Sequence, residues 1–313
     1  MEVTPANLTK NELCETHYEP TESLSNAYKR AKITIDSVEN WGAVVTYKVL
    51  VGVFTVKIRM LNINDEVRQG VYEKLINSGA FGKIVMGNGP RGEFVSKRFY
   101  FSGTLELAQK TANTDEWIIR ANFTNLEAVL LEFAIARVLS MFSIAPKILN
   151  PYGFDILCYR NCVEFSMERC LLWSFGYASF NQGEMESRLK YCMKVMHSLR
   201  IVHRDIKPGN IVFSPSIGDL VLCDFGISHP IAEEIGFKTK TVQSGTYSFM
   251  SPELVSISVI IPAYADLYYN DIHCLQTSLK VMEIQRPEPQ PLVSLPQNPL
   301  CGVLTTLYKL WKK

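Results

Sequence analysis

The 313-residue sequence has no excess of charge of either sign, because 32 Lys and Arg face 31 Asp and Glu. An overall attraction to nucleic acid or to a membrane surface is therefore not expected. Long apolar runs are also missing. The most apolar stretches, residues 41–56 and 254–264, are interrupted by polar residues or proline and fall short of the roughly 18 apolar residues of a transmembrane helix. We expect neither nucleic-acid binding nor membrane insertion.

The sequence also lacks a signal peptide and a full set of zinc ligands. Eight cysteines are scattered through a chain that opens with polar residues, which is typical of the reducing interior of a cell, cytoplasmic or nuclear. Cys158, Cys162 and Cys170 form the only cluster, and no second Cys or His pair stands at ligand spacing. A zinc site is therefore disfavoured.

The two ends of the chain differ from its middle. Residues 1–30 are polar and predict an extended or disordered arm. Residues 33–61 are rich in β-formers and predict two or three strands, which either join the next sheet or form a small unit of their own. Prolines break up residues 286–299, so only a short final helix is expected at 303–313.

The middle of the chain changes from strands to helices. Residues 71–100 predict a β-meander with glycine turns. Residues 126–142 have apolar positions on most faces, which predicts a helix packed against another part of the fold. A second amphipathic helix is expected at 184–199, with short strands at 211–213 and 220–224. This order predicts an α+β fold with a small β-rich lobe and a mainly helical lobe.

Two polar motifs follow the second helix. Residues 203–210 read HRDIKPGN, and residues 224–226 read DFG. Together they resemble the catalytic loop (HRDxKxxN) and the metal-binding loop of eukaryotic protein kinases. An ordinary polar loop rarely matches so many positions at this separation.

The resemblance implies a role for each polar residue of these motifs. Phosphoryl transfer needs a positioned hydroxyl, metal ions and charge neutralisation rather than covalent chemistry by the protein. Asp205 would accept or orient the proton of the substrate hydroxyl, and Lys207 would lie near the γ-phosphate of ATP. Asn210 and Asp224 would bind Mg²⁺, which prefers oxygen ligands.

Residues 77–84 read NSGAFGKI and lie between two predicted strands. They resemble the kinase glycine-rich loop GxGxxGxV, with Asn in place of the first glycine, and Asn tolerates left-handed backbone better than most residues. A Walker A interpretation fails, because Ile84 stands where Ser or Thr would bind magnesium. The residues implied to contact the nucleotide are Asn77, Ser78, Gly79, Ala80, Phe81, Gly82 and Ile84.

Lys97 follows in the sequence VSK and resembles the lysine of the kinase AxK strand, which contacts the α- and β-phosphates. The family pairs this lysine with a glutamate on a helix. Glu132 is the preferred candidate and Glu127 the alternative. The segment between Lys97 and this helix is longer than usual and is interpreted as an insertion.

Residues 165–170 read FSMERC and resemble the hinge between kinase lobes. The resemblance implies that Met167 is the gatekeeper and that backbone groups from Glu168 to Cys170 hold the adenine. The alternative is a buried strand end without a ligand role. Cys223, directly before DFG, would lie beside the same pocket or act as a small buried apolar residue.

Residues 244–253 read SGTYSFMSPE and resemble the Ser/Thr kinase segment GTxxYMAPE. Thr246 would bridge Asp205 and Lys207. The segment favours a protein substrate over a lipid or a small molecule, and Lys207 favours Ser/Thr over Tyr, because tyrosine kinases usually place Ala or Arg near this position.

Arg204 precedes the catalytic Asp and is the residue type that pairs with a phosphorylated activation loop in many kinases. Thr239, Thr241 and Ser244 are the candidate phosphosites. We therefore hypothesise activation by an upstream kinase.

Asp271 resembles the aspartate that opens the long helix of the kinase C-lobe and anchors the catalytic-loop backbone. Only 42 residues follow it in the 313-residue chain, so the C-lobe is expected to be shortened. Glu253 usually pairs with a late arginine, and Arg286 is the only arginine that follows it.

The sequence thus predicts an N-terminal extension at 1–66 and a protein kinase domain at 67–313, with its N-lobe at 67–168 and a shortened C-lobe at 169–313. The predicted function is a Ser/Thr protein kinase that uses ATP and Mg²⁺. The alternative is a pseudokinase scaffold that binds nucleotide or partner proteins without turnover. A compact, divergent kinase of this kind is compatible with a viral enzyme acting in a host cell.

Overall fold

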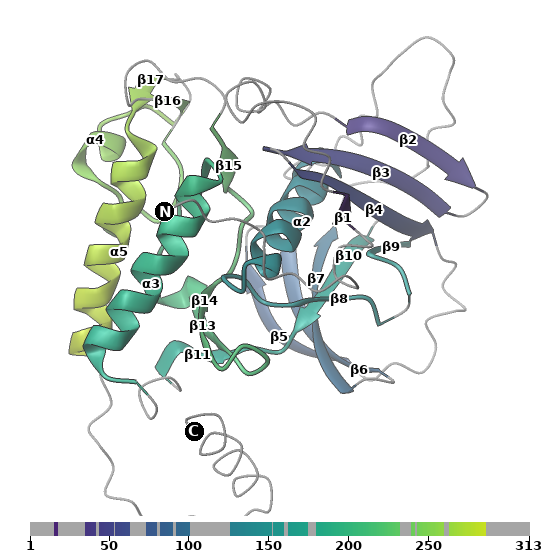
Figure 1. The fold of residues 1–313 in the computed structure, drawn as a ribbon, viewed down its shortest axis with the longest axis horizontal. Coiled ribbons are helices and arrows are strands. Elements are labelled where there is room, and N and C mark those ends of the chain that lie inside the picture. Colours follow the sequence, from purple (N-terminus) through teal and green to yellow (C-terminus); the bar gives the residue numbers. More distant parts are fainter. Residues whose placement is uncertain are drawn as a thin grey trace, which may run out of the picture.

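The computed structural model of the chain shows a strand-rich lobe beside a helical lobe (Figure 1). It describes residues 16–17, 35–41, 44–52, 54–62, 73–79, 82–89, 92–100, 126–151, 153–159, 162–174, 180–231, 239–241, 243–259 and 263–285. Most of the predicted arm, the predicted insertion, Arg286 and the predicted helix at 303–313 lie outside these residues.

Ten strands form the sheet of the first lobe. Their bounds are β1 Thr16–His17, β2 Ile35–Trp41, β3 Val44–Val51, β4 Phe54–Asn62, β5 Glu73–Gly79, β6 Gly82–Gly89, β7 Gly92–Tyr100, β8 Ile148–Leu149, β9 Ile156–Tyr159 and β10 Cys162–Glu168. The strand order is β2-β3-β4-β9-β10-β7-β6-β5, while β1 pairs with β4 and β8 with β10. Helix α2, Leu126–Met141, packs on this sheet.

Strands β5, β6 and β7 form the predicted meander, which the structure confirms. Gly82 opens β6 with a φ of 140°. A Cβ atom there would lie 2.1 Å from the carbonyl oxygen of Arg98 on β7. Only glycine allows the two backbones to approach this closely and adopts such a φ without strain. The register places Ile84 opposite Lys97.

Strands β2, β3 and β4 belong to the same sheet as strands β5 to β7. The strands predicted at 33–61 therefore join the next sheet and do not form a small unit of their own. The connection is a parallel pairing of β4 with β9, in which Met60 lies opposite Ile156. At the start of this pairing, the Arg59 amide donates to the Asp155 carboxylate at 2.8 Å, and the Asp155 amide donates to the Arg59 carbonyl at 3.0 Å. Backbone hydrogen bonds therefore join the β-rich N-terminal segment to the rest of the lobe.

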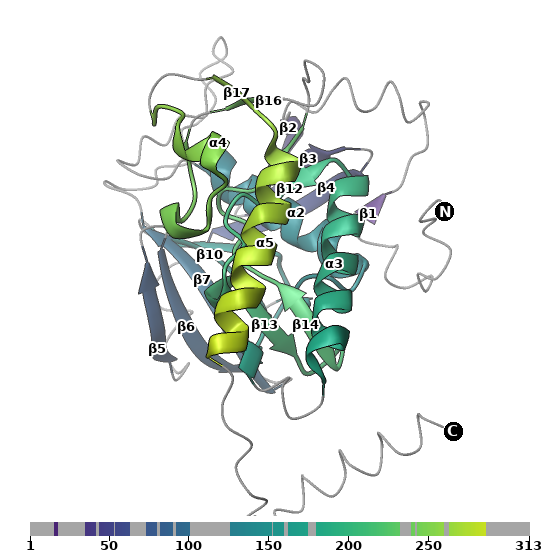
Figure 2. The ribbon, with the colours of Figure 1, turned by 90° about the vertical axis from the view of Figure 1, so that its left-hand side faces the viewer.

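The second lobe contains two long helices that lie side by side (Figure 2). These are α3, Gln182–Ser198, and α5, Leu267–Ile284; a short helix α4 spans Pro252–Val255. Asn181 caps α3 in a capping box with Glu184, and Asp266 caps α5. The short strands are β11 Leu171–Leu172, β12 Ile201–Val202, β13 Ile211–Ser214, β14 Asp219–Leu222, β15 His229–Pro230, β16 Thr239–Thr241 and β17 Ala263–Ala265.

The helices and short strands confirm the predicted order of elements, with shifts of one or two residues at their ends. The α+β fold with two unlike lobes is confirmed as well. One hydrophobic core runs through both lobes and includes residues of β3, β4, α2, α3 and α5. No helix among the described residues has both the length and the apolar character needed to span a bilayer.

Candidate active site

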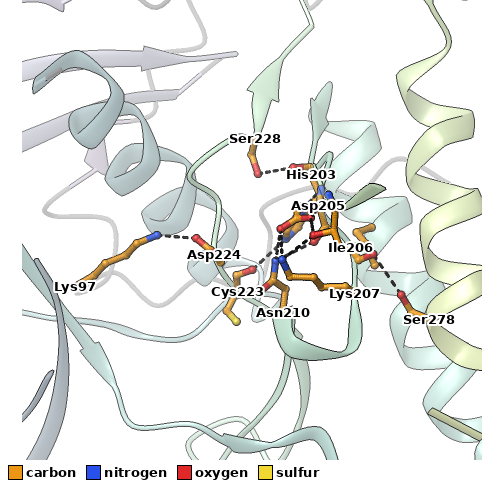
Figure 3. Close-up of polar contacts among 11 residues, drawn as sticks. Lys97, His203, Asp205, Ile206, Lys207, Asn210, Cys223, Asp224, Ser228 and Ser278 are labelled. Atoms are coloured by element: carbon orange, nitrogen blue, oxygen red, sulfur yellow. Dashed lines mark hydrogen bonds and ion pairs between the residues drawn. The ribbon is translucent and has the colours of Figure 1, made fainter. Parts of the chain in front are cut away.

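The loop between β12 and β13 brings two polar side chains, those of Lys207 and Asn210, to the carboxylate of Asp205 (Figure 3). Lys207 Nζ donates to Asp205 Oδ2 at 2.8 Å, and Asn210 Nδ2 donates to the same oxygen at 3.0 Å. Asn210 Nδ2 also donates to the Asp205 carbonyl at 2.9 Å. The loop therefore holds the Asp205 carboxylate in one orientation.

Thr246 binds the other oxygen of Asp205. Its amide and its hydroxyl donate to Asp205 Oδ1 at 2.8 and 2.6 Å, and Lys207 Nζ donates to Thr246 Oγ1 at 2.8 Å. The neighbouring Gly245 has a φ of 114°, and a Cβ atom there would lie 2.3 Å from the Arg204 carbonyl oxygen. Glycine is thus required where this segment approaches the loop.

Lys97 connects two carboxylates between the lobes. Its Nζ donates to Glu132 Oε1 at 2.5 Å and to Asp224 Oδ1 at 2.6 Å. Burial lowers the pKa of Lys97, but Glu132 and Asp224 outweigh this effect and raise that pKa above its ordinary value. Lys97 is therefore held as a cation. The side chain of Glu127, the alternative partner, lies outside the described residues.

Asp224 has the properties of a cation ligand. Burial raises the pKa of its carboxyl, but Lys97 outweighs this effect, so the pKa is below its ordinary value and the group is ionised. The side chain remains 40% exposed and has a backbone φ of 64°, a strained region for a residue other than glycine. Such strain is common at functional sites.

Asn210 is held close to this carboxylate by backbone contacts. The amide of Cys223, the residue before Asp224, donates to the Asn210 carbonyl at 2.9 Å. Because the side-chain nitrogen of Asn210 donates to Asp205, the side-chain oxygen of Asn210 is the atom suited to bind a cation. Among the described residues, no group of three or more His, Cys, Asp and Glu side chains could hold a metal ion. Cys158, Cys162 and Cys170 form no such group either. The donor set fits Mg²⁺ completed by phosphate oxygens.

Asp271 anchors the backbone of the loop. Its fully buried carboxylate accepts from the amides of His203 and Arg204, both at 2.8 Å, and contacts His197 Nε2 at 3.1 Å. The Arg204 backbone, whose amide Asp271 binds, is left-handed, with a φ of 71°. The prediction that Asp271 opens the helix is wrong. Helix α5 begins at Leu267, so Asp271 lies in its second turn.

Parts of this chain are similar in sequence to known proteins. Residues 178–272 match the protein kinase domain. This part of the chain is therefore similar to a eukaryotic-type protein kinase domain. Serine/threonine-protein kinase Sgk1 of Gallus gallus is 31% identical over 190 residues, which are 58% of this chain and 39% of that relative. A probable myosin light chain kinase of Dictyostelium discoideum is 36% identical over 83 residues, 26% of this chain and 17% of that relative.

The chain spans about two fifths of the length of the Sgk1 relatives it matches, since the shared region is 39% of theirs. The Rattus norvegicus Sgk1 has the same 31% identity over 190 residues. The two lobes of the structure are those of the protein kinase fold, with β5–β7, β9 and β10 in the N-lobe and α3 and α5 in the C-lobe.

The residues predicted to form a glycine-rich loop, 77–84, lie where β5 ends and β6 begins. Asn77, Ser78 and Gly79 form the end of β5, and Gly82 begins β6. The ladder is irregular between Leu75 and Asn77. Ala80 and Phe81 lie outside the described residues.

The predicted hinge begins at the end of β10, where Glu168 contacts residues of both lobes. The Glu168 amide donates to the Lys147 carbonyl at 2.8 Å, and its carboxylate accepts from the Lys147 amide and from Ser214 Oγ, both at 2.7 Å. This amide and this side chain are thus used within the protein, which leaves the Glu168 carbonyl and the backbone of Cys170 as the groups suited to adenine. Met167 is partly buried and packs against the core.

Two thiols lie beside this region, at Cys170 and Cys223. Burial raises the pKa of both, to about 12 for Cys223. Both are therefore neutral at physiological pH and behave as small apolar groups rather than nucleophiles.

The segment predicted to be the activation segment contacts Arg204. Arg204 Nη2 donates to the buried Thr241 Oγ1 at 2.8 Å. Thr239 lies opposite Ala265 in the β16–β17 ladder, while Ser244 Oγ is buried without a hydrogen-bond partner among the described residues. Of the candidate phosphosites, Thr241 is the one that the structure brings to Arg204.

Sequence reasoning missed three supports of the catalytic loop. His197 contacts Asp271. Ser228 Oγ donates to the His203 carbonyl at 3.2 Å, and Ser278 Oγ donates to the Ile206 carbonyl at 3.3 Å (Figure 3). His197 and Ser278 lie on helices with no local motif, so no sequence signal identifies them. Ser228 stands two residues after DFG, where its short distance from the metal-binding loop is the only hint.

Proposed function

We propose that this chain is a Ser/Thr protein kinase that transfers the γ-phosphoryl group of ATP to protein hydroxyls. The observation that carries the proposal is the cluster of Asp205, Lys207, Asn210 and Thr246, because it places a carboxylate, a cation and an amide at one point. Positioned groups of this kind are what phosphoryl transfer requires of the protein.

Asp205 would orient the substrate hydroxyl and take its proton. A carboxylate has about four lone-pair sites, and donors from Lys207, Asn210 and Thr246 already fill them. A substrate hydroxyl must therefore replace one donor. Lys207 is the natural one, because its ammonium sits on a flexible chain and would be attracted to the γ-phosphate.

Bound Mg²⁺ would neutralise charge on the phosphates, with Asp224 and Asn210 as its protein ligands. Lys97 would face the α- and β-phosphates. Its charge is already secured by Glu132, so no proton has to move when a nucleotide binds. The contact between Lys97 and Asp224 would loosen when Lys97 binds the phosphates and Asp224 binds Mg²⁺.

The second candidate is a pseudokinase that binds nucleotide without turnover. The family match begins at residue 178 and so does not include Lys97, Glu132 or the glycine-rich loop. This leaves the nucleotide-binding half of the site without support from the family match.

One assay separates the two. The purified chain is incubated with Mg²⁺, γ-labelled ATP and generic protein substrates, beside an Asp205→Asn control, and the labelled amino acids are identified. We expect phosphoserine and phosphothreonine above the control. Label no higher than in the control, together with thermal stabilisation by ATP, would support the pseudokinase instead.

We further propose that an upstream kinase activates this chain at Thr241. A phosphate there would replace the single bond from the Arg204 guanidinium to a neutral hydroxyl by bonds between two opposite charges. Active protein should then carry phosphothreonine at Thr241 by mass spectrometry. An unmodified Thr239, Thr241 and Ser244, with full activity in their triple alanine variant, would reject the idea.

A further inference from the structure

Helix α2 carries Glu132 and is buried around nearly its whole circumference. Val129, Ile135 and Val138 are fully buried, and Ala128 is the one exposed residue among its described side chains. A helix that lies on one face of a sheet normally buries a single stripe. α2 must therefore be covered on a second side.

That second cover is the N-terminal meander, defined here as strands β2 to β4, residues 35–62. Alternate residues of β3 and β4 are buried, so each strand directs one face inward. These residues share one core with the apolar residues of α2: Val45, Tyr47, Val49, Val51, Phe54, Val56, Ile58 and Met60. Strands β3 and β4 are the main strand contacts of α2, and Figure 1 shows them alongside it.

The meander also contacts the end of α2. The ring of Phe54, the first residue of β4, packs edge-on against Phe142 with centroids 6.0 Å apart. Phe142 directly follows the last residue of α2. The helix is therefore fixed both along its side and at its C-terminus.

Helix α2 is also connected to Lys97 through a series of aromatic rings. Phe133, next to Glu132, packs edge-on against Phe165, with centroids 5.5 Å apart. Phe165 stacks on Phe99 at 5.9 Å, and Lys97 Nζ lies 5.4 Å from the centroid of Phe99. A shift of α2 would thus move Glu132 and disturb the packing beneath Lys97.

We propose that the N-terminal meander is a built-in positioning element that holds α2 where Glu132 pairs with Lys97. Its buried residues are positioning residues for nucleotide binding, and the role in turnover rests on the proposed kinase function. The meander lies outside the residues matched to the kinase domain, so this support comes from a part of the chain that the family match does not cover.

The physical reason is that a buried ion pair tolerates little movement. Lys97 and Glu132 are 6% and 5% exposed, so separation would leave two poorly solvated charges. Misplacement of a catalytic group by about 1 Å can reduce activity by about a hundredfold. A helix held from both sides meets this tolerance better than one held only by β8, β10 and the loops.

The test is a double-mutant cycle between the meander and the ion pair. Val49→Ala removes buried apolar volume from β3, and Glu132→Gln removes the charge that pairs with Lys97. Val195→Ala on α3 is the matched control, because it makes the same change at an equally buried site in the other lobe. Each variant is assayed for Mg-ATP affinity, for kcat and KM, and for hydrogen exchange of α2.

We expect Val49→Ala to weaken Mg-ATP affinity by about tenfold, and by less than about twofold in the Glu132→Gln background. Exchange of the α2 amides should rise in Val49→Ala and remain unchanged in Val195→Ala. Equal losses of affinity in both backgrounds, or equal effects of the two Val→Ala changes on α2 exchange, would overturn the proposal.

These readouts separate the positioning role from catalysis. If wild-type protein binds Mg-ATP without transferring phosphate, the kinase proposal fails while the affinity cycle still decides the role of the meander. If it binds no nucleotide, hydrogen exchange of α2 decides it, since that measurement needs neither ligand nor turnover.

Discussion

Replacement of Asp271 by asparagine tests whether α5 holds the catalytic loop. Asp271 is fully buried, and its two carboxylate oxygens accept from the amides of His203 and Arg204, both at 2.8 Å. Asparagine has nearly the same shape but offers one oxygen and one NH₂ group. In Asp271→Asn, one of the two amides must therefore face another donor.

The expected loss of stability can be worked from these contacts. A hydrogen bond to a charged group contributes about 1.5–3 kcal/mol, and a buried donor without an acceptor costs a similar amount. Arg204 is also held with a φ of 71°, a conformation that costs of order 1 kcal/mol without such support. We expect Asp271→Asn to lower the free energy of unfolding by about 3 kcal/mol, within the roughly 5–15 kcal/mol of a typical domain.

The assay is equilibrium unfolding in urea followed by tryptophan fluorescence, with turnover measured in parallel. Asp266→Asn is the control, because it makes the same substitution in the same helix. Asp266 caps α5 by accepting from the Tyr269 amide at 2.8 Å, and asparagine is an equally good N-cap, so we expect a change below about 0.5 kcal/mol. Equal losses in both variants, or a loss below about 1 kcal/mol in Asp271→Asn with normal turnover, would refute the reasoning.

Three further predictions concern neighbouring contacts. Thr246→Val should reduce kcat by about 10- to 100-fold, because Lys207 loses an acceptor and Asp205 a donor, whereas Thr246→Ser should stay within about threefold of wild type in a steady-state assay. Gly245→Ala should lower the free energy of unfolding in urea by about 2 kcal/mol, since its Cβ would lie 2.3 Å from the Arg204 carbonyl oxygen; an unchanged free energy of unfolding would contradict the close approach. Tyr47→Phe should raise the free energy of unfolding by about 1 kcal/mol, because the buried hydroxyl has no hydrogen-bond partner among the described residues; a loss of stability would show that a partner exists.

Local sequence was sufficient where function depends on residues close together in the chain. The loop at 203–210 resembles the kinase catalytic loop, and this resemblance named Asp205, Lys207 and Asn210, whose side chains the structure brings together. Helical composition located α2, and amphipathic periodicity located α3, each to within two residues.

Longer-range relations were not available from the sequence. Strands were predicted at 33–61, but not the parallel pairing of β4 with β9, because alternation reveals a strand and not its neighbour. The apolar surface of α2 indicated packing without naming the partner. The start of α5 was misplaced because Asp271 was assigned from resemblance, whereas Asp266 is the residue that caps the helix.

The most direct test of the central claim compares Asp205→Asn with Asp224→Asn, measuring phosphoryl transfer and Mg-ATP affinity for both. If Asp205 serves the substrate hydroxyl, Asp205→Asn should reduce transfer by about a thousandfold and leave affinity within about threefold. If Asp224 holds the metal, Asp224→Asn should lose both transfer and magnesium-dependent affinity. Wild-type transfer by Asp205→Asn would contradict the account.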